Sequence, residues 1–180
     1  MKQSMSTKFI KKYMRLAKFI GEDQPVCFSR HIGAVITNAE GTRVLGCGYN
    51  GPPRGVPHCD TSEFLKNYFM PRLDECDFIA KCKGICPRRL IKANSGERMD
   101  LCPAQHAETN AIINAACDLT GAHLFCWCPV PCVNCSGAII QAGIAAVHCL
   151  ETIYDDRSLW LLEKGGVTLH QYTEDILCNI

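Results

Sequence analysis

The sequence contains no long hydrophobic run. No stretch approaches the roughly 18 consecutive apolar residues that a membrane-spanning helix requires. It also lacks an excess of either charge, because 19 Lys and Arg residues are balanced by 18 Asp and Glu residues. A protein that mainly neutralises nucleic-acid phosphates needs a basic surplus. We therefore expect neither a membrane nor a polynucleotide as its partner.

Aromatic residues and repeats are also scarce. Phe, Trp and Tyr make up only 8% of the chain, which leaves few platforms for stacking single-stranded bases. The sequence has no internal repeat or low-complexity tract, and without an apolar leader segment we expect no signal peptide. The composition, 47% hydrophobic and 21% charged, is ordinary for a globular protein, and we expect residues 1–180 to form a single domain.

Cysteine, by contrast, is abundant, with 14 residues in the chain. Such a density indicates either disulfides or metal sites. Disulfide-dense chains are usually short secreted modules with a small core, whereas a chain of this length can bury a core of its own. We therefore expect reduced thiols that bind zinc in a cytoplasmic protein.

The N-terminal segment allows two interpretations. Basic residues precede the first acidic one, as in a mitochondrial presequence; they are Lys2, Lys8, Lys11, Lys12, Arg15 and Lys18. Apolar residues nevertheless recur there at helical spacing, at Phe9, Tyr13, Leu16 and Ile20. We favour the second interpretation, an amphipathic helix that packs one face on the core.

The order of helix and strand patterns predicts the fold class. Strands are expected over 31–37, 43–50, 122–128, 145–150 and 167–172, and helices over 104–117, 132–142 and 155–164. Two β-rich runs followed by alternating helices and strands predict an α/β fold, a three-layer α/β/α sandwich around a five-stranded mixed sheet. A Cys-rich insertion at about 52–103 has little periodicity beyond a short helix around 62–69, so it needs an organiser such as zinc.

Two short motifs carry the chemistry. His106-Ala107-Glu108 begins one predicted helix, and Pro131-Cys132-Val133-Asn134-Cys135 begins another. Two cysteines spaced Cys-x-x-Cys at a helix start can face one metal ion, and the helix dipole favours their thiolates. With His106 as the third ligand, Cys132 and Cys135 would leave the fourth position of a tetrahedral zinc open for water, as catalytic zinc sites do.

Glu108 is the expected catalytic acid and base. It lies on the same helical turn as His106 but need not ligate, so it can exchange protons with a water that zinc has acidified. The pattern H-x-E followed by P-C-x-x-C is the signature of zinc nucleobase deaminases. Either motif alone is weak evidence for a deaminase, since a lone His is often a core residue and Cys-x-x-Cys also occurs in redox sites and zinc ribbons. Together they favour hydrolytic deamination.

Four segments, in this order, resemble the deoxycytidylate (dCMP) deaminase family. They are Ile32–Ile36, Gly48–Asp60 with its Gly-Tyr-Asn-Gly-x-Pro motif, His106–Ile112 and Pro131–Cys135. The resemblance implies a cytidine deaminase-like fold and conversion of dCMP to dUMP for thymidylate synthesis. It also implies a homohexamer that dCTP with Mg²⁺ activates and dTTP inhibits, in the cytoplasm, or in the host cytoplasm if the protein is viral.

The same resemblance implies a set of substrate-binding residues. Asn50 is expected to hold the deoxyribose and phosphate region, with Ser29 and Arg30 on the phosphate side and Ala107 and Tyr154 near the nucleotide. An Asn amide can donate to and accept from a sugar hydroxyl, and Arg can pair with two phosphate oxygens. Without the resemblance, Asn50-Gly51 would read as a simple turn.

The family often carries a second, structural zinc, which the resemblance assigns to the Cys-rich region. The candidate ligands are Cys27, His58, Cys59, Cys86 and Cys102. Spacing does not decide which four of them ligate, or whether Cys76 and Cys82 complete a further site. The alternative is that some cysteines are small buried hydrophobes, which we expect of Cys47, Cys117, Cys126 and Cys149. We expect packing or surface roles for His31, His123, His148 and His170, and solvated charge for most basic residues of the insertion.

Other functions remain open. The same centre could deaminate dCTP, a tRNA adenosine or a heterocycle of the riboflavin pathway. A non-catalytic, zinc-stabilised binding module is the alternative from a different class. Glu108 argues against that module, because a structural zinc site does not require a carboxylate beside an open coordination position.

Overall fold

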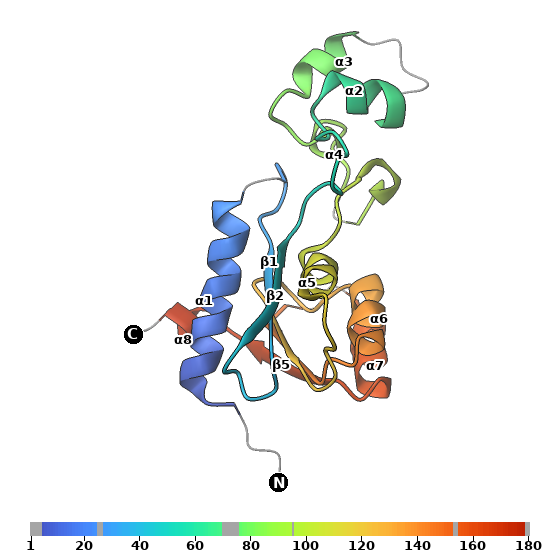
Figure 1. The fold of residues 1–180 in the computed structure, drawn as a ribbon. Coiled ribbons are helices and arrows are strands. Elements are labelled where there is room, and N and C mark those ends of the chain that lie inside the picture. The colour runs from blue at the N-terminus through green and yellow to red at the C-terminus, as the bar shows by residue number, and fades with distance from the viewer. Residues whose placement is uncertain (1–4, 25–26, 70–75, 95, 153–154, 179–180) are drawn as a thin grey trace. The chain divides into compact units, whose positions relative to one another are not determined.

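The computed structural model describes residues 5–24, 27–69, 76–94, 96–152 and 155–178. Two compact units make up the chain (Figure 1). Unit 1 comprises Met1–Gln24, Ile32–Tyr49 and His106–Ile180, and unit 2 comprises Pro25–His31 and Asn50–Gln105. That the whole chain acts as a single deaminase domain stays a prediction.

Unit 1 is built on a five-stranded mixed sheet of strand order β2-β1-β3-β4-β5. Strand β1 (Gly33–Thr37) pairs antiparallel with β2 (Val44–Tyr49) and with β3 (His123–Cys126). Strands β4 (Ala146–Leu150) and β5 (Thr168–Tyr172) continue the sheet parallel to β3. The mixed sheet expected from the sequence is therefore confirmed, with strand ends that differ by one or two residues.

Helices cover both faces of this sheet. Figure 1 shows α1 (Thr7–Asp23) along one face and α5 (Ala107–Ala115), α6 (Val133–Gln141) and α7 (Asp156–Lys164) along the other. The short helix α8 (Glu174–Cys178) joins the α1 side, where Leu177 is buried in the same cluster as Tyr13. The predicted α/β/α sandwich is confirmed for unit 1. The sequence analysis missed α8.

Helix α1 is the amphipathic helix predicted from its apolar spacing. Tyr13 and Ala17 are buried, and Phe9, Leu16 and Ile20 are partly buried against the same cluster. The Tyr13 hydroxyl donates to the carbonyl of Gly41 at 2.6 Å, which ties the helix to the β1–β2 turn. Neither α1 nor any other helix in the described part of the chain is long and apolar enough to cross a membrane.

Glycines let α5 lie directly on β2. A Cβ added to Gly48 would lie 2.4 Å from the backbone nitrogen of Ala111 and 2.6 Å from the carbonyl oxygen of Ala107, so no side chain fits there. The contact is reinforced by Asn110, whose Nδ2 donates to the carbonyl of Tyr49 at 2.8 Å. This close packing fixes the helix whose first turn carries the His-Ala-Glu motif.

A row of rings crosses β3, β4 and β5 on the α1 face of the sheet. His148 is buried between Phe125 and His170, with ring centroids 4.4 and 4.7 Å away. Its Nδ1 lies 2.8 Å from the Tyr172 hydroxyl and its Nε2 lies 3.0 Å from His123 Nδ1. Burial, together with the His170 and His123 imidazoles, lowers the pKa of His148 to about 3. The expected packing role is confirmed for His148, but the hydrogen-bonded row was not foreseen.

Unit 2 contains only short helical segments among its described residues. They are α2 (Ser62–Phe64), the π-helical turn η1 (Leu65–Phe69), α3 (Cys76–Lys81), α4 (Pro87–Leu90) and the 3₁₀ turn η2 (Met99–Leu101). Its buried hydrophobic cluster consists of Phe64, Leu65 and Cys82. The helix expected at 62–69 is present as α2 and η1. A hydrophobic core this small contributes little stability to a unit of more than 50 residues.

Two cysteines differ from expectation. Cys47 and Cys117, predicted to be buried, are exposed. Cys47 lies on the edge strand β2, where its side chain alternates away from the buried Gly46 and Gly48. Cys117 follows the end of α5 at Ala115 instead of lying inside the helix. The prediction of burial is confirmed for Cys126 and Cys149.

Candidate metal centre

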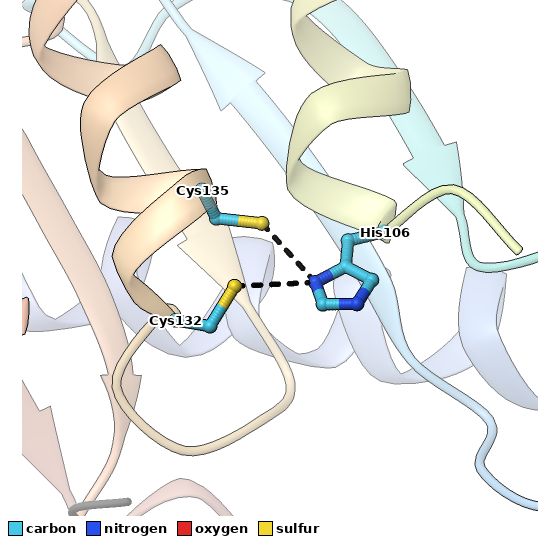
Figure 2. A group of neighbouring side chains, drawn as sticks. All are labelled: His106, Cys132 and Cys135. Atoms are coloured by element: carbon cyan, nitrogen blue, oxygen red, sulfur yellow. Dashed lines mark hydrogen bonds between the residues drawn. The ribbon is translucent and has the colours of Figure 1, made fainter. Parts of the chain in front are cut away.

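The three expected zinc ligands come together at the starts of two helices. His106 is the N-cap of α5, Cys132 is the N-cap of α6, and Cys135 lies in the first turn of α6 (Figure 2). The Cys132 and Cys135 sulfurs lie 3.5 and 3.3 Å from His106 Nδ1. Among the described residues, this is the group of potential ligands whose donor atoms all lie within 4.8 Å of one another.

The two cysteines are shifted in pKa in opposite directions. The hydrogen bond with Cys135 lowers the pKa of Cys132 to about 4, although burial opposes this, and the bond with His106 lowers it further. The same bond with Cys132, with burial, raises the pKa of Cys135. Cys132 is therefore a thiolate at neutral pH, at a helix N-terminus whose dipole favours negative charge.

The donor set suits zinc. Two sulfurs and one imidazole nitrogen are the donors that tetrahedral zinc sites use, and three protein ligands leave one position open. Thr109 Oγ1 lies 3.8 Å from the Cys135 sulfur, within hydrogen-bonding reach of this ligand. Ser136 Oγ donates to the carbonyl of Pro131 at 3.2 Å, which holds the loop that leads into Cys132.

Glu108 lies beside this group, buried in the first turn of α5 with only 4% of its surface exposed. Burial raises the pKa of its carboxyl group above the usual value. The Cys128 thiol donates to Glu108 Oε1 at 3.9 Å. A buried carboxyl group with a raised pKa can both accept and return a proton near neutral pH, as general acid–base catalysis requires.

Ala107 separates His106 from Glu108 and is fully buried. Its methyl group belongs to the hydrophobic cluster between the sheet and α5, α6 and α7. It is also the first residue of α5, so its backbone N–H is one of the helix's leading donors, which have no partner inside the helix. Any contact of Ala107 with a nucleotide would therefore involve its backbone.

Three of the expected substrate residues lie together in unit 2. Asn50 is largely buried and its Nδ2 donates to the carbonyl of Arg30 at 2.9 Å. The neighbouring Ser29 accepts a bond from Arg89 Nε at Oγ, at 3.1 Å, and Arg89 Nη2 donates to its carbonyl at 3.3 Å. Arg89 belongs to the basic residues of the insertion, most of which were expected to be solvated; it is exposed, and no sequence pattern indicated its bond to Ser29. Tyr154, the remaining expected residue, lies outside the described residues.

The thiols proposed for a second zinc are neighbours in unit 2. Burial raises the pKa of Cys59 to about 12, and the nearby thiols of Cys86, Cys27 and Cys102 add to the rise. Their donor atoms are less tightly gathered than those around His106, since only that first group meets the 4.8 Å limit among the described residues.

His58, the alternative ligand, already has one ring nitrogen engaged. Its Nδ1 lies 2.8 Å from Asp60 Oδ1, and Asp60 Oδ2 accepts a bond from the backbone N–H of Gly84 at 2.9 Å. Burial raises the pKa of the neighbouring Cys82 to about 11, with Asp60 and Cys86 adding to the rise. Carboxylates commonly orient histidines in this way beside metal sites, so the Asp60 contact leaves both His58 and Cys59 as candidates.

Comparison with known proteins identifies relatives. Residues 7–151 match the family model for the cytidine and deoxycytidylate deaminase zinc-binding region. A deoxycytidylate deaminase of Schizosaccharomyces pombe is 33% identical over 149 residues, which cover 81% of this chain and 38% of the yeast protein. One from Mycobacterium phage D29 is 33% identical over 127 residues, which cover 67% of this chain and 78% of the phage protein. The chain thus spans less than half of its yeast relative.

A solved structure has the same fold. It is a dCMP deaminase from the cyanophage S-TIM5, in complex with dCMP and dUMP, and it superposes with a TM-score of 0.63 at 20% sequence identity. The alignment covers 94% of this chain and 100% of the phage chain. The similarity therefore extends over both the sheet of unit 1 and the Cys-rich region.

Proposed function

Because this chain belongs to the cytidine and deoxycytidylate deaminase family with a zinc-binding region, we propose that it hydrolyses dCMP to dUMP and ammonia. One observation carries the proposal. His106, Cys132 and Cys135 form a group of three residues with zinc-type donors. The buried carboxyl group of Glu108 lies two residues along the chain from His106. A structural site has no use for that carboxyl group, whereas hydrolytic deamination requires one.

Glu108 is the residue that we propose transfers protons during the reaction. Zinc held by His106, Cys132 and Cys135 would supply a water of lowered pKa as the nucleophile. Glu108 accepts a proton from that water and delivers it to N3 of the cytosine, while the oxygen bonds to C4. The proton of the new C4 hydroxyl group then passes through Glu108 to the amino group, the bond between C4 and that nitrogen breaks, the C4 carbonyl forms, and ammonia leaves. Water and dCMP are thereby converted to dUMP and ammonia without a net change in Glu108.

Three of the residues proposed to bind the nucleotide belong to unit 2. Asn50, Ser29 and Arg30 are proposed to hold the sugar and phosphate, with Ala107 contributing its backbone and Tyr154 lying near the nucleotide. The bond between Asn50 and the Arg30 carbonyl and the anchoring of Ser29 by Arg89 support this, because they tie the segment that carries Ser29 and Arg30 to the segment that begins at Asn50. A site that binds a phosphate monoester benefits from such preorganised donors.

A second, structural zinc is proposed for Cys27, Cys59, Cys86 and Cys102, with His58 as the alternative to Cys59. The mutual effect of these thiols on the pKa of Cys59 supports the proposal. The small hydrophobic core of unit 2 supports it as well, since a closed zinc site contributes directly to folding.

Several features stay predictions. They are activation by dCTP with Mg²⁺, inhibition by dTTP, assembly as a homohexamer, a cytoplasmic location and supply of dUMP for thymidylate synthesis.

The test is ammonia release from purified, zinc-loaded protein. We expect turnover of dCMP and at least tenfold lower kcat/KM for deoxycytidine and cytidine, because both lack the phosphate. Adding dCTP with Mg²⁺ should raise the rate with dCMP, and dTTP should lower it. Turnover of dCTP but not dCMP, or of a tRNA adenosine or a riboflavin-pathway heterocycle, would contradict the substrate while keeping the chemistry. No turnover of any of them would favour the non-catalytic module.

A further inference from the structure

Three buried cysteines outside the ligand set surround Glu108. Cys126 and Cys149 are fully buried and Cys128 is 6% exposed. Because side chains alternate along β3 and its continuation, Leu124, Cys126 and Cys128 face the side of the sheet that α5 covers, where Glu108 lies in the first turn. Three thiols of the same chemistry thus lie near one carboxyl group, and their contacts can be compared directly.

Only one of the three thiols is placed to bind Glu108 within the described part of the chain. The Cys128 sulfur donates to Glu108 Oε1 at 3.9 Å, whereas the Cys126 sulfur donates to the carbonyl of His148 at 3.7 Å. Cys149 is close enough for Glu108 to raise its pKa, yet it makes no hydrogen bond to Glu108 there. The backbone of Cys128 is itself held, since its carbonyl accepts from the N–H of Leu150 at 2.9 Å.

Cys135 does not replace this donor once metal is bound. Its thiol also hydrogen-bonds Glu108 and thereby lowers the pKa of the carboxyl group. As a zinc ligand, however, Cys135 would be a thiolate and would have no proton to donate. Cys128 does not belong to the ligand group, so a metal held there would not engage its sulfur.

We propose that Cys128 is a positioning residue of the deaminase centre, whose thiol holds one carboxyl oxygen of Glu108 and leaves the other for proton transfer. The terminal torsion of a Glu side chain has broad, nearly two-fold preferences, so the side chain alone does not decide which oxygen faces the substrate. A donor on one side removes that ambiguity. The inference rests on the proposed function, since it assigns to Cys128 an effect on proton transfer by Glu108.

Infrared spectroscopy tests the contact without relying on activity. The S–H stretching band of Cys128 is obtained as the difference between the wild-type protein and Cys128→Ala, and the same difference is measured in a Glu108→Gln background. We expect the band to shift between the two backgrounds, because the acceptor changes from a carboxyl group to an amide. The Cys149→Ala difference serves as the matched control and should shift less. Equal Cys128 bands in both backgrounds would overturn the proposal.

Kinetics test the consequence. Cys128→Ala should lower kcat for dCMP about 3- to 10-fold, which corresponds to one ordinary hydrogen bond, while KM and the zinc content stay unchanged. Cys128→Ser retains a donor and should recover most of the loss, and Cys149→Ala removes an equally buried thiol and should leave kcat nearly unchanged. Equal losses of kcat in Cys128→Ala and Cys149→Ala, or a change confined to KM or zinc content, would contradict the proposal and show that Cys128 has a structural role alone. If wild-type protein does not deaminate dCMP, the proposed function fails, and the infrared comparison still decides whether Cys128 holds Glu108.

Discussion

Cys132 of unit 1 and Cys59 of unit 2 are shifted in pKa in opposite directions. In unit 1 the pKa of Cys132 is lowered to about 4, because Cys135 and His106 hydrogen-bond its sulfur at the start of a helix. In unit 2 the pKa of Cys59 is raised to about 12, because the thiol is buried and its neighbours are further thiols. Cys132 is thus favoured as an anion, whereas Cys59, like Cys135 of unit 1, is favoured in its neutral form.

The surroundings explain the difference. The ligands of unit 1 extend from two helices that pack on a sheet with an extensive buried cluster. Among the described residues of unit 2, three form its buried hydrophobic cluster, and the thiols lie in loops or beside short helical turns. The first centre is therefore preorganised by packing, whereas the small hydrophobic cluster of unit 2 is the reason for proposing a metal site there.

The largest effect is expected from removing the carboxyl group of Glu108 without touching a ligand. Glu108→Gln should reduce kcat for dCMP by about 10²- to 10⁴-fold, the usual contribution of a general acid and base. Zinc content should stay at the wild-type value in both units, because Glu108 is not among the proposed ligands. The exposed Glu163→Gln is the matched control and should remain fully active. A Glu108→Gln enzyme with wild-type turnover would contradict the mechanism.

Ligand removal separates the two units by their zinc content. Cys132→Ala should bind one zinc per chain, held by unit 2, as measured by elemental analysis. Cys86→Ala should also bind one, held by unit 1, and its amide hydrogen exchange should accelerate within residues 50–105 while the sheet of unit 1 stays protected. Exposed Cys117→Ala is the control and should keep two. A Cys132→Ala protein without zinc would contradict the second site.

Acid should weaken unit 1 through His148 independently of its metal. The folded-state pKa of His148 is about 3 and the unfolded value is 6.5, so the unfolded chain binds the proton more readily. The resulting stability is present above pH 6.5 and is lost as the pH falls toward 3. Between pH 7 and 5 the free energy of unfolding should fall by about 2 kcal/mol from this group.

Chemical denaturation of the zinc-loaded protein at the two pH values measures this loss. His148→Gln, which does not titrate, should show a shallower pH dependence than wild-type protein. His31→Gln, at an exposed position outside the row, should not alter it. The same slope in wild-type protein and His148→Gln would contradict the assignment.

The smallest effect concerns a helix cap in unit 2. Thr61 is the N-cap of α2, and its Oγ1 accepts a bond from the N–H of Phe64 at 3.2 Å. Thr61→Ala should lower local stability by about 1 kcal/mol, seen as faster amide exchange over residues 62–69 in the zinc-loaded protein. Ser62→Ala, at the exposed neighbouring position, should have a smaller effect. Equal amide exchange rates in Thr61→Ala and Ser62→Ala would contradict the role of the cap and would indicate that metal alone orders this segment.

Much of unit 1 could be predicted because its signals are local. Short runs rich in apolar residues located β1 and β3, and the spacing of Phe9, Tyr13 and Leu16 located α1. The position of Cys47 could not be predicted in the same way, because burial on a strand depends on whether that strand lies at the edge of the sheet. The helix α8 was missed, since a segment of five residues offers too little periodicity.

The sequence by itself determined which residue types could hold the metal and that the donor atoms of each motif lie at the start of a helix. His106 and Cys132 each precede a helix, Cys135 follows one turn later, and helical geometry brings the donors of each motif to one end. Tertiary structure alone decided that Cys128 binds Glu108, that Arg89 anchors Ser29, and that His148 is stacked between two rings. These partners are 20 or more residues apart in sequence, so which side chains meet depends on strand order and on how closely helices pack, and no local pattern records either.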